Sequence, residues 1–225
     1  MRYNIDMNKE LFEKLNLAEY IQAADKVLEQ MKITEHNVAH LTRVVNMSRL
    51  ILTELGYDDE HTLELSELAG YMHDFGNIVN RHDHAHSSAL LAHTILLNAD
   101  YELSDIFEVM SAVANHNEAT GNPISPISAA LIIADKADVR RSRVRKQDIS
   151  TFDIHDRVNY AVQASTIHVN KEKKIITLRL SLDTDYSSVV EYLEIFTGRM
   201  KLCKKSAKYL GCKFKLMIND MELID

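Results

Sequence analysis

Apolar residues recur at helical spacing through the first two thirds of the chain. From Leu11 to about Arg145 they repeat every three or four residues, which is the pattern of amphipathic helices. The pattern predicts helices at residues 16–31, at residues 62–74, 86–97, 104–116 and 125–139, and in a segment capped by Thr34 that runs to Gly56. We therefore expect an all-helical bundle in a mostly α fold.

The hydrophobic period changes from 3.6 to two after Ser150. Residues 158–164 and 176–182 alternate between apolar and polar, with a charged turn at residues 171–174 between them. A long amphipathic helix at residues 189–210, stopped by Gly211, precedes a third alternating run at residues 213–218. This order predicts a small β-β-α-β module.

The change of period divides the chain into a helical domain at residues 1–150 and an α+β module at residues 151–225. A two-stranded hairpin is marginally stable alone. The module should therefore pack on the bundle, take its third strand into its own sheet, or pair with a second copy in a homodimer.

Composition restricts the classes of partner. The 33 acidic and 26 basic residues leave a net charge of -7, so no global charge draws the chain to nucleic acid or to an anionic membrane. Neither a signal peptide nor a membrane-spanning helix fits the sequence, and the two cysteines, Cys203 and Cys212, read as free thiols in a reducing compartment. We expect a cytoplasmic protein.

Histidines and aspartates lie on helix faces that should be buried. His40 shares its row with apolar residues, a His-Asp pair ends the helix at residues 62–74, and three more such groups lie on the apolar rows of three further helices. The full set is His40, His73, Asp74, His86, His116 and Asp135. A buried polar group without a partner costs about 1–3 kcal/mol, and a shared cation satisfies several at once.

The donor types indicate which ions fit. Four imidazoles and two carboxylates suit Mn, Fe, Co, Ni or Zn better than Ca or Mg. Six protein ligands are too many for a closed tetrahedral zinc site. Two divalent transition metal ions with open positions fit the count better.

The ordered series resembles the HD-domain metal-dependent phosphohydrolases. The matching motifs are His40 in HLTRVV, His73 and Asp74 in GYMHDFGN, His86 in HSSALLA, His116 in NHNE and Asp135 in ADKAD. The likeness spans about residues 34 to 145, and the HSSA and ADKADVRRSR segments are most similar to bacterial dinucleotide tetraphosphate hydrolases. The family's fold is an all-helical bundle, in agreement with the pattern of the residues.

The resemblance implies a role for each residue. His40, His73, Asp74 and Asp135 would ligate one metal, and Asp74 would bridge to a second ion held by His86 and His116. A hydroxide shared by the ions would cleave a phosphoester or phosphoanhydride of a nucleotide or another small phosphate compound. Lys136 and Arg43 would offer positive charge to the phosphate, whereas Asn77 stands where many members carry a lysine.

Several alternatives stay open on the sequence. His82 or His84 could replace His86 as a ligand, and His36 could be a ligand or a substrate contact. The basic run at residues 140–146 could attract a polyphosphate or could be a solvated helix end. A di-iron oxygenase, or a regulatory module that binds metal and nucleotide without catalysis, would use the same ligands.

Overall fold

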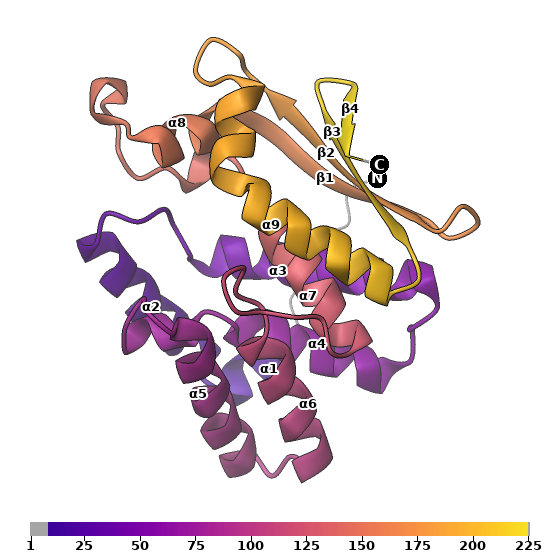
Figure 1. The fold of residues 1–225 in the computed structure, drawn as a ribbon. Helices are drawn as coiled ribbons and strands as arrows, with labels where there is room; N and C mark the ends of the chain where they lie inside the picture. Colours follow the sequence, from indigo (N-terminus) through magenta and orange to yellow (C-terminus); the bar gives the residue numbers. More distant parts are fainter. Residues whose placement is uncertain (1–8, 225) are drawn as a thin grey trace.

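The computed structural model describes residues 9–224, and the first part of the chain folds into a helical bundle (Figure 1). The α-helices of the bundle are α1 (Lys9–Lys14), α2 (Leu17–Gln30), α3 (Val38–Leu55), α4 (Glu60–Met72), α5 (His84–Asn98), α6 (Leu103–Ala114) and α7 (Pro126–Ala137). Helix α7 is central, since all its residues except Pro126 and Asp135 are buried. It packs against α3 and α4 within the bundle and against the later helix α9 (Val189–Tyr209). The predicted mostly α fold with a small C-terminal α+β module is confirmed.

Helix boundaries follow the capping residues, and one predicted cap is wrong. Helix α3 begins after Asn37, whose side-chain oxygen accepts hydrogen bonds from the backbone N–H groups of Ala39 and His40 at 3.0 and 3.3 Å. Thr34, the predicted cap, lies before the helix in a segment without regular structure. An asparagine beside the first helical residue satisfies the free N–H groups directly, so it outcompetes a threonine farther upstream. The helix ends at Gly56 as predicted, with φ of 90°.

The alternating pattern at residues 158–164 does not form one strand. Residues 154–161 form helix α8 (Ile154–Ala161), and strand β1 (Val162–Asn170) begins only afterwards. A capping box between Asp153 and Asp156 starts the helix. Val158 and Ala161 are buried on one side of it, so helical spacing fits these residues better than the alternation does.

The C-terminal module is a four-stranded sheet crossed by one long helix. Strands β1, β2 (Ile175–Leu182), β3 (Lys213–Ile218) and β4 (Met221–Ile224) are hydrogen-bonded in sequence order. Strands β1 and β2 form the predicted antiparallel hairpin, whereas β3 runs parallel to β2 because α9 crosses over between them. The sequence did not predict β4, which returns antiparallel to β3 through Asn219 and Asp220, two residues in left-handed conformation.

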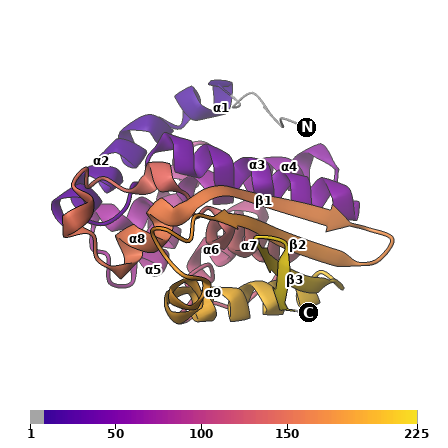
Figure 2. The same ribbon diagram turned by 90° about the horizontal axis from the view of Figure 1, so that it is seen from above.

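The module packs directly on the bundle. Strand β1 lies along α3 in the view of Figure 2, and α9 packs on both α7 and β3. The Ser165 hydroxyl on β1 donates to the carbonyl oxygen of Ala137 at the end of α7. Most of the buried apolar residues of bundle and module belong to one hydrophobic cluster. The predicted boundary at residue 150 falls in a short 3-10 helix, η3 (Ile149–Thr151).

Two further expectations concern single features of the chain. Cys203 and Cys212 are free thiols, as predicted, and both are buried. Within residues 9–224, no helix is both long and apolar enough to cross a membrane.

Candidate metal centre

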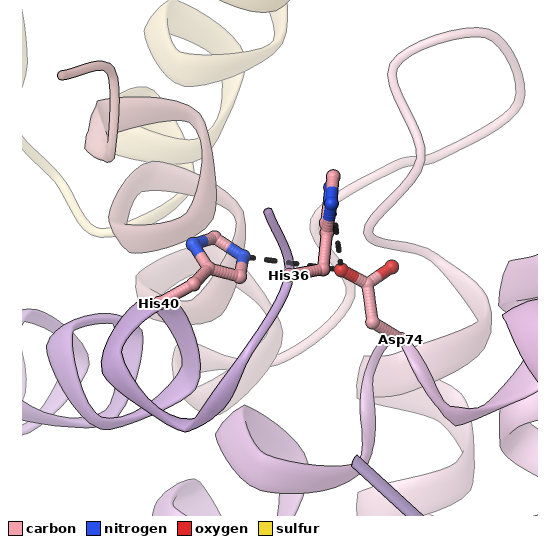
Figure 3. A group of neighbouring side chains, drawn as sticks. All are labelled: His36, His40 and Asp74. Atoms are coloured by element: carbon pink, nitrogen blue, oxygen red, sulfur yellow. Dashed lines mark ion pairs between the residues drawn. The ribbon is translucent and has the colours of Figure 1, made fainter. Parts of the chain in front are cut away.

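Five separate segments bring imidazoles and carboxylates to one point inside the bundle. His40 lies in the first turn of α3, His73 and Asp74 directly follow α4, and His84 opens α5. His116 follows α6, and Asp135 lies in the last turn of α7. The imidazoles of His40, His73, His84 and His116 are buried, as is the Asp74 carboxylate, and His36 joins them from the segment before α3. Figure 3 shows His36 and His40 approaching the same Asp74 carboxylate.

A glycine makes the approach of two of these segments possible. Asp74 leads into the short 3-10 helix η1 (Phe75–Ile78), which packs against the start of α5. A Cβ atom on Gly76 would lie 2.0 Å from the carbonyl oxygen of His84 and 2.5 Å from the backbone nitrogen of Ser88. The Gly76 N–H donates instead to the Ser88 hydroxyl at 2.7 Å. Any larger residue at position 76 would push Asp74 and His84 apart.

Asp74 lies at the middle of the cluster and presents its two oxygens to different groups of imidazoles. Its Oδ2 atom is 3.2 Å from Nε2 of His73 and 3.8 Å from Nε2 of both His36 and His40. Its Oδ1 atom is 3.5 Å from Nε2 of His84. The carboxylate therefore spans two sets of nitrogen donors.

Asp135 and His116 complete the two ends of the cluster. Oδ1 of Asp135 lies 3.7 Å from Nε2 of both His40 and His73. At the other end, the Nε2 atoms of His84 and His116 are 3.2 Å apart. Three groups of donor atoms, each within 4.8 Å of one another, could hold a metal ion: His36–His40–Asp74, His40–His73–Asp135 and His73–Asp74–His116.

Every imidazole of the cluster is held by its Nδ1 atom, so that Nε2 points inward. The Nδ1 atoms of His73, His84 and His116 lie 2.8, 3.1 and 2.7 Å from backbone carbonyl oxygens within their own turns. Nδ1 of His36 lies 2.7 Å from a backbone oxygen, and Nδ1 of His40 lies 2.8 Å from the Asp138 carboxylate. Because these oxygens accept hydrogen bonds, Nδ1 carries a proton, and in its neutral form each ring turns a bare Nε2 lone pair to the centre.

These inward lone pairs have no adequate partners within the protein. The Nε2 atoms of His40 and His73 are buried and make no hydrogen bond. Those of His84 and His116 face each other, and two bare lone pairs at 3.2 Å are satisfied only by a shared proton or by a cation. Buried histidines that are bound through one nitrogen and open at the other have the geometry of metal ligands. The residues present fit divalent transition metal ions.

The electrostatics keep most donors in the form that binds a metal. Burial lowers the pKa of His116 to about 3 and also lowers the pKa of His40 and His84. Burial opposes ionisation of Asp74 and Asp135, yet His73, whose own pKa is raised by the Asp74 charge despite burial, and Lys136 beside Asp135 hold the pKa of the two carboxyls well below the ordinary value. The rings of His40, His84 and His116 are therefore neutral and these carboxylates charged at pH 7, as metal coordination requires.

Comparison with known families identifies this part of the chain. The family model described as the HD domain matches residues 37–141, the segment that supplies every donor above except His36. This segment of the chain is similar to the HD domain. Among solved structures, the chain matches the crystal structure of a predicted HD superfamily hydrolase from an uncultured Thermotogales bacterium, with 24% identity and a TM-score of 0.46. That match covers 58% of this chain and 69% of the other. No curated protein matches the chain.

The structure replaces one predicted member of the cluster. His86 is exposed on the outer face of α5 and does not reach the centre, whereas His84, two residues earlier, is buried there. His82 is exposed as well and pairs with Asp83. The prediction assumed that α5 begins at residue 86, but the helix begins at His84, so His86 faces solvent. His36, left open on the sequence, does reach this cluster of imidazoles and carboxylates around Asp74, which we call the HD centre.

Lys136 and Arg43, the two cations that the resemblance implied for the phosphate, are both paired with carboxylates of the protein. Lys136 is buried, and its ammonium group is 2.7 Å from Asp135 and 2.9 Å from Glu118, so two carboxylates surround it. Arg43 turns away from the HD centre and lies 2.8 Å from Asp138 through Nε. Its Nη2 atom donates to the carbonyl oxygen of Ser165 on β1. Both residues are occupied by partners within the protein.

Asp138, which sequence reasoning missed, supports the centre from behind. It is fully buried, and its Oδ2 atom lies 2.8 Å from Nδ1 of His40. Its Oδ1 atom accepts from Arg140 at 2.9 Å, and Arg143 donates to its backbone oxygen at 2.7 Å. The fixed carboxylate sets the orientation of the His40 ring. The available signal was its place three residues after Asp135 in the ADKAD motif.

The cations of the basic run at residues 140–146 have partners within the protein. Arg143 is buried, with Nε bound to the backbone oxygen of Glu35. Arg145 bonds to the backbone of Ile33 and to the Asp25 carboxylate, and Lys146 pairs with Asp156. Arg141 donates to Tyr160 and Asp183 of the C-terminal module. The run joins α7 to the segment before α3 and to the C-terminal module.

Proposed function

We propose that the protein is a metal-dependent phosphohydrolase that cleaves a phosphoester or phosphoanhydride bond of a nucleotide or another small phosphorylated compound. The observation that carries this proposal is the set of inward Nε2 atoms around the Asp74 carboxylate, which are fixed through Nδ1 and, at His40 and His73, have no hydrogen-bond partner. The HD domain of residues 37–141 supports it at the level of the family. The metal is one of Mn, Fe, Co, Ni or Zn, because imidazole and carboxylate donors suit these ions.

The donors divide between two adjacent positions. His40, His73, Asp74 and Asp135 would hold one ion, since their donor atoms form one continuous set. His84 and His116 would hold a second, next to the other oxygen of Asp74. Because Asp74 faces both sets with different oxygens, we infer a dinuclear centre in which this carboxylate bridges. His36 is an additional donor beside Oδ2 of Asp74.

The ions would supply an acidified water and positive charge for the phosphoryl oxygens, and two ions about 3.5–4 Å apart can serve the attacking and leaving oxygens together. The protein's own contribution is orientation. Asp138 and the backbone carbonyls hold each ring at one angle, so no donor must reorganise during the reaction. Lys136 keeps Asp135 charged and oriented through its 2.7 Å contact.

The first test measures metal content and activity in the same preparations. We expect about two equivalents of transition metal per chain, and hydrolysis of a panel of nucleotides and phosphoesters that depends on added Mn, Co or Fe. His73→Ala should abolish both. Metal-dependent turnover that needs dioxygen would instead indicate a di-iron oxygenase, and metal or nucleotide binding without turnover would indicate a regulatory role.

A matched pair of variants on α5 tests the ligand assignment. His84→Ala should lose metal from one position and most activity, whereas His86→Ala should retain both, because the two residues differ only in the direction they face. Circular dichroism and thermal melting check that both variants are folded. A His86→Ala variant that loses metal while His84→Ala keeps it would contradict the assignment.

A further inference from the structure

The cations near the HD centre differ in how completely the protein neutralises them. Lys136 is buried between Asp135 and Glu118, at 2.7 and 2.9 Å. Arg43 and Arg140 lie 2.8 and 2.9 Å from the Asp138 carboxylate. These three cations are held by ion pairs with carboxylates, so none of them is available to an incoming anion without breaking an internal contact.

Arg81 is a cation of a different kind at the same centre. It lies on the loop between η1 and α5, and its side chain is 32% exposed. Nη1 donates to the side-chain oxygen of Asn77 at 3.1 Å and lies 3.8 Å from Oδ1 of Asp74, beyond hydrogen-bond distance. Among the described residues, no partner binds its Nε and Nη2 atoms. One edge of the guanidinium is therefore open beside the proposed bridging carboxylate.

The loop that carries Arg81 is positioned by the centre itself. Its backbone oxygen lies 3.1 Å from Nδ1 of His84, so the same residue orients a ligand ring and presents a cation. Asn77 is buried and bonds to both the backbone and the side chain of Asp74 at 2.8 and 3.0 Å. The Arg81 side chain is thus connected to Asp74 through its hydrogen bond to Asn77.

From this geometry we propose that Arg81 is the residue that binds the phosphoryl group of the substrate, through the open edge of its guanidinium. A planar guanidinium can donate two parallel hydrogen bonds to two oxygens of one phosphate group. Metal ions bound at the centre would compensate the negative charge of Asp74. The positive charge of Arg81 would then be free to interact with the phosphate group. The inference rests on the proposed function, and it names the protein group that selects phosphorylated compounds at this site.

The experiment uses inorganic phosphate as the probe and the full-length Mn-loaded protein. Calorimetric titration measures phosphate binding directly, and phosphate inhibition of the hydrolysis gives a second, independent value. Arg81→Ala should weaken both by about tenfold to a hundredfold, which corresponds to the loss of a charge-assisted hydrogen bond. Arg81→Lys should retain part of the affinity, because it keeps the charge but loses the paired donors.

Arg179→Ala is the matched control. Arg179 is exposed on β2, away from the centre, and its substitution removes the same charge. It should leave phosphate affinity, KM and metal content unchanged. Metal content should also stay unchanged in Arg81→Ala, since Arg81 is a cation and not a ligand, and a raised KM with a smaller change in kcat is the expected kinetic pattern.

The outcomes separate this inference from the proposed function. Metal-dependent hydrolysis with KM and phosphate affinity unchanged in Arg81→Ala would overturn the role of Arg81 and leave the hydrolase intact. Phosphate binding that depends on Arg81 in a protein without hydrolytic activity would support the phosphate site and contradict the hydrolase. Absence of phosphate binding to the Mn-loaded wild type would overturn the role of Arg81.

Discussion

Two buried polar clusters lie next to each other in this protein and differ in whether their polar atoms have partners. Around Asp138, carboxylate and backbone oxygens accept bonds from His40, Arg140 and Arg143 at 2.7–2.9 Å. At the HD centre, the inward Nε2 atoms of His40 and His73 have no partner. A saturated cluster is stable as it stands, whereas an unsaturated one needs a ligand. His40 belongs to both, with one ring nitrogen in each.

The strongest way to break this comparison is to remove the carboxylate at the middle of the centre. Asp74→Ala takes away the group that faces both sets of imidazoles, so both ions should be lost. Activity should fall by about a thousandfold or more, since metal ions contribute several kcal/mol to the transition state. Elemental analysis and steady-state assays measure this, with the exposed Asp185→Ala as the control. Full activity in Asp74→Ala would exclude the proposed centre.

Substitution of Asp138 in the saturated cluster should mainly lower the free energy of unfolding. Asp138→Ala removes the carboxylate that accepts hydrogen bonds from His40 and Arg140, and a hydrogen bond to a charged group contributes about 1.5–3 kcal/mol. Urea unfolding of the metal-free protein measures this loss. Because His40 also loses its support, activity should drop by about 10–100-fold at full metal loading. Asp138→Asn keeps an acceptor and should recover part of both effects; equal losses in the two variants would contradict the assigned role.

Metal removal should lower the Tm of the wild type and should leave the Tm of a variant that lacks a metal ligand unchanged. An ion present at about 100 times its Kd stabilises the folded state by about 2.7 kcal/mol, which for a chain of this size raises Tm by about 5–10 °C. Chelation should reverse this increase in the wild type and in Asp138→Asn. Asp74→Ala should show the same Tm with and without metal, and a metal-dependent shift in that variant would place the ions elsewhere.

The smallest expected effect comes from a satisfied carboxylate in the C-terminal module. Hydrogen bonds from Ser188, Arg157 and Ser187 lower the pKa of Glu191 to about 2, from an ordinary value of 4.5. A depressed carboxyl pKa stabilises the fold above pH 4.5, and this contribution is lost as the pH falls toward 2. Glu191→Gln should therefore cost about 1 kcal/mol at pH 7 through the weakened cap, with a difference that shrinks below pH 4. Chemical unfolding across this range checks it, and a difference independent of pH would contradict it.

The contribution of local pattern is clearest at α5. The sequence indicates a helix with histidines near its start, and it leaves His82, His84 and His86 as alternatives. The choice depends on where the helix begins and on the close contact of Gly76 with His84, which turns that residue inward. A shift of two residues in a helix reverses the face, so boundary errors of this size decide a ligand.

Arg43 shows a limit of a different kind. Its spacing from His40 on α3 suggested a charge near the phosphate, yet its partners are Asp138 and the Ser165 carbonyl on β1. Those partners lie far from Arg43 in the sequence; Ser165, for example, is 122 residues away. Helical periodicity shows which residues lie on the same face of a helix. It carries no information about which distant segment packs on that face.

The sequence alone determined the succession of helices, the change to a β-containing module, and the imidazoles and carboxylates that face the interior, because these depend on local periodicity and residue chemistry. Only the tertiary structure decided that His84 rather than His86 reaches the centre, that residues 154–161 are helical, and that the basic run at residues 140–146 is bound internally. Each of these depends on contacts between segments distant in the chain, where a buried charge takes whichever partner the packing brings within hydrogen-bond distance.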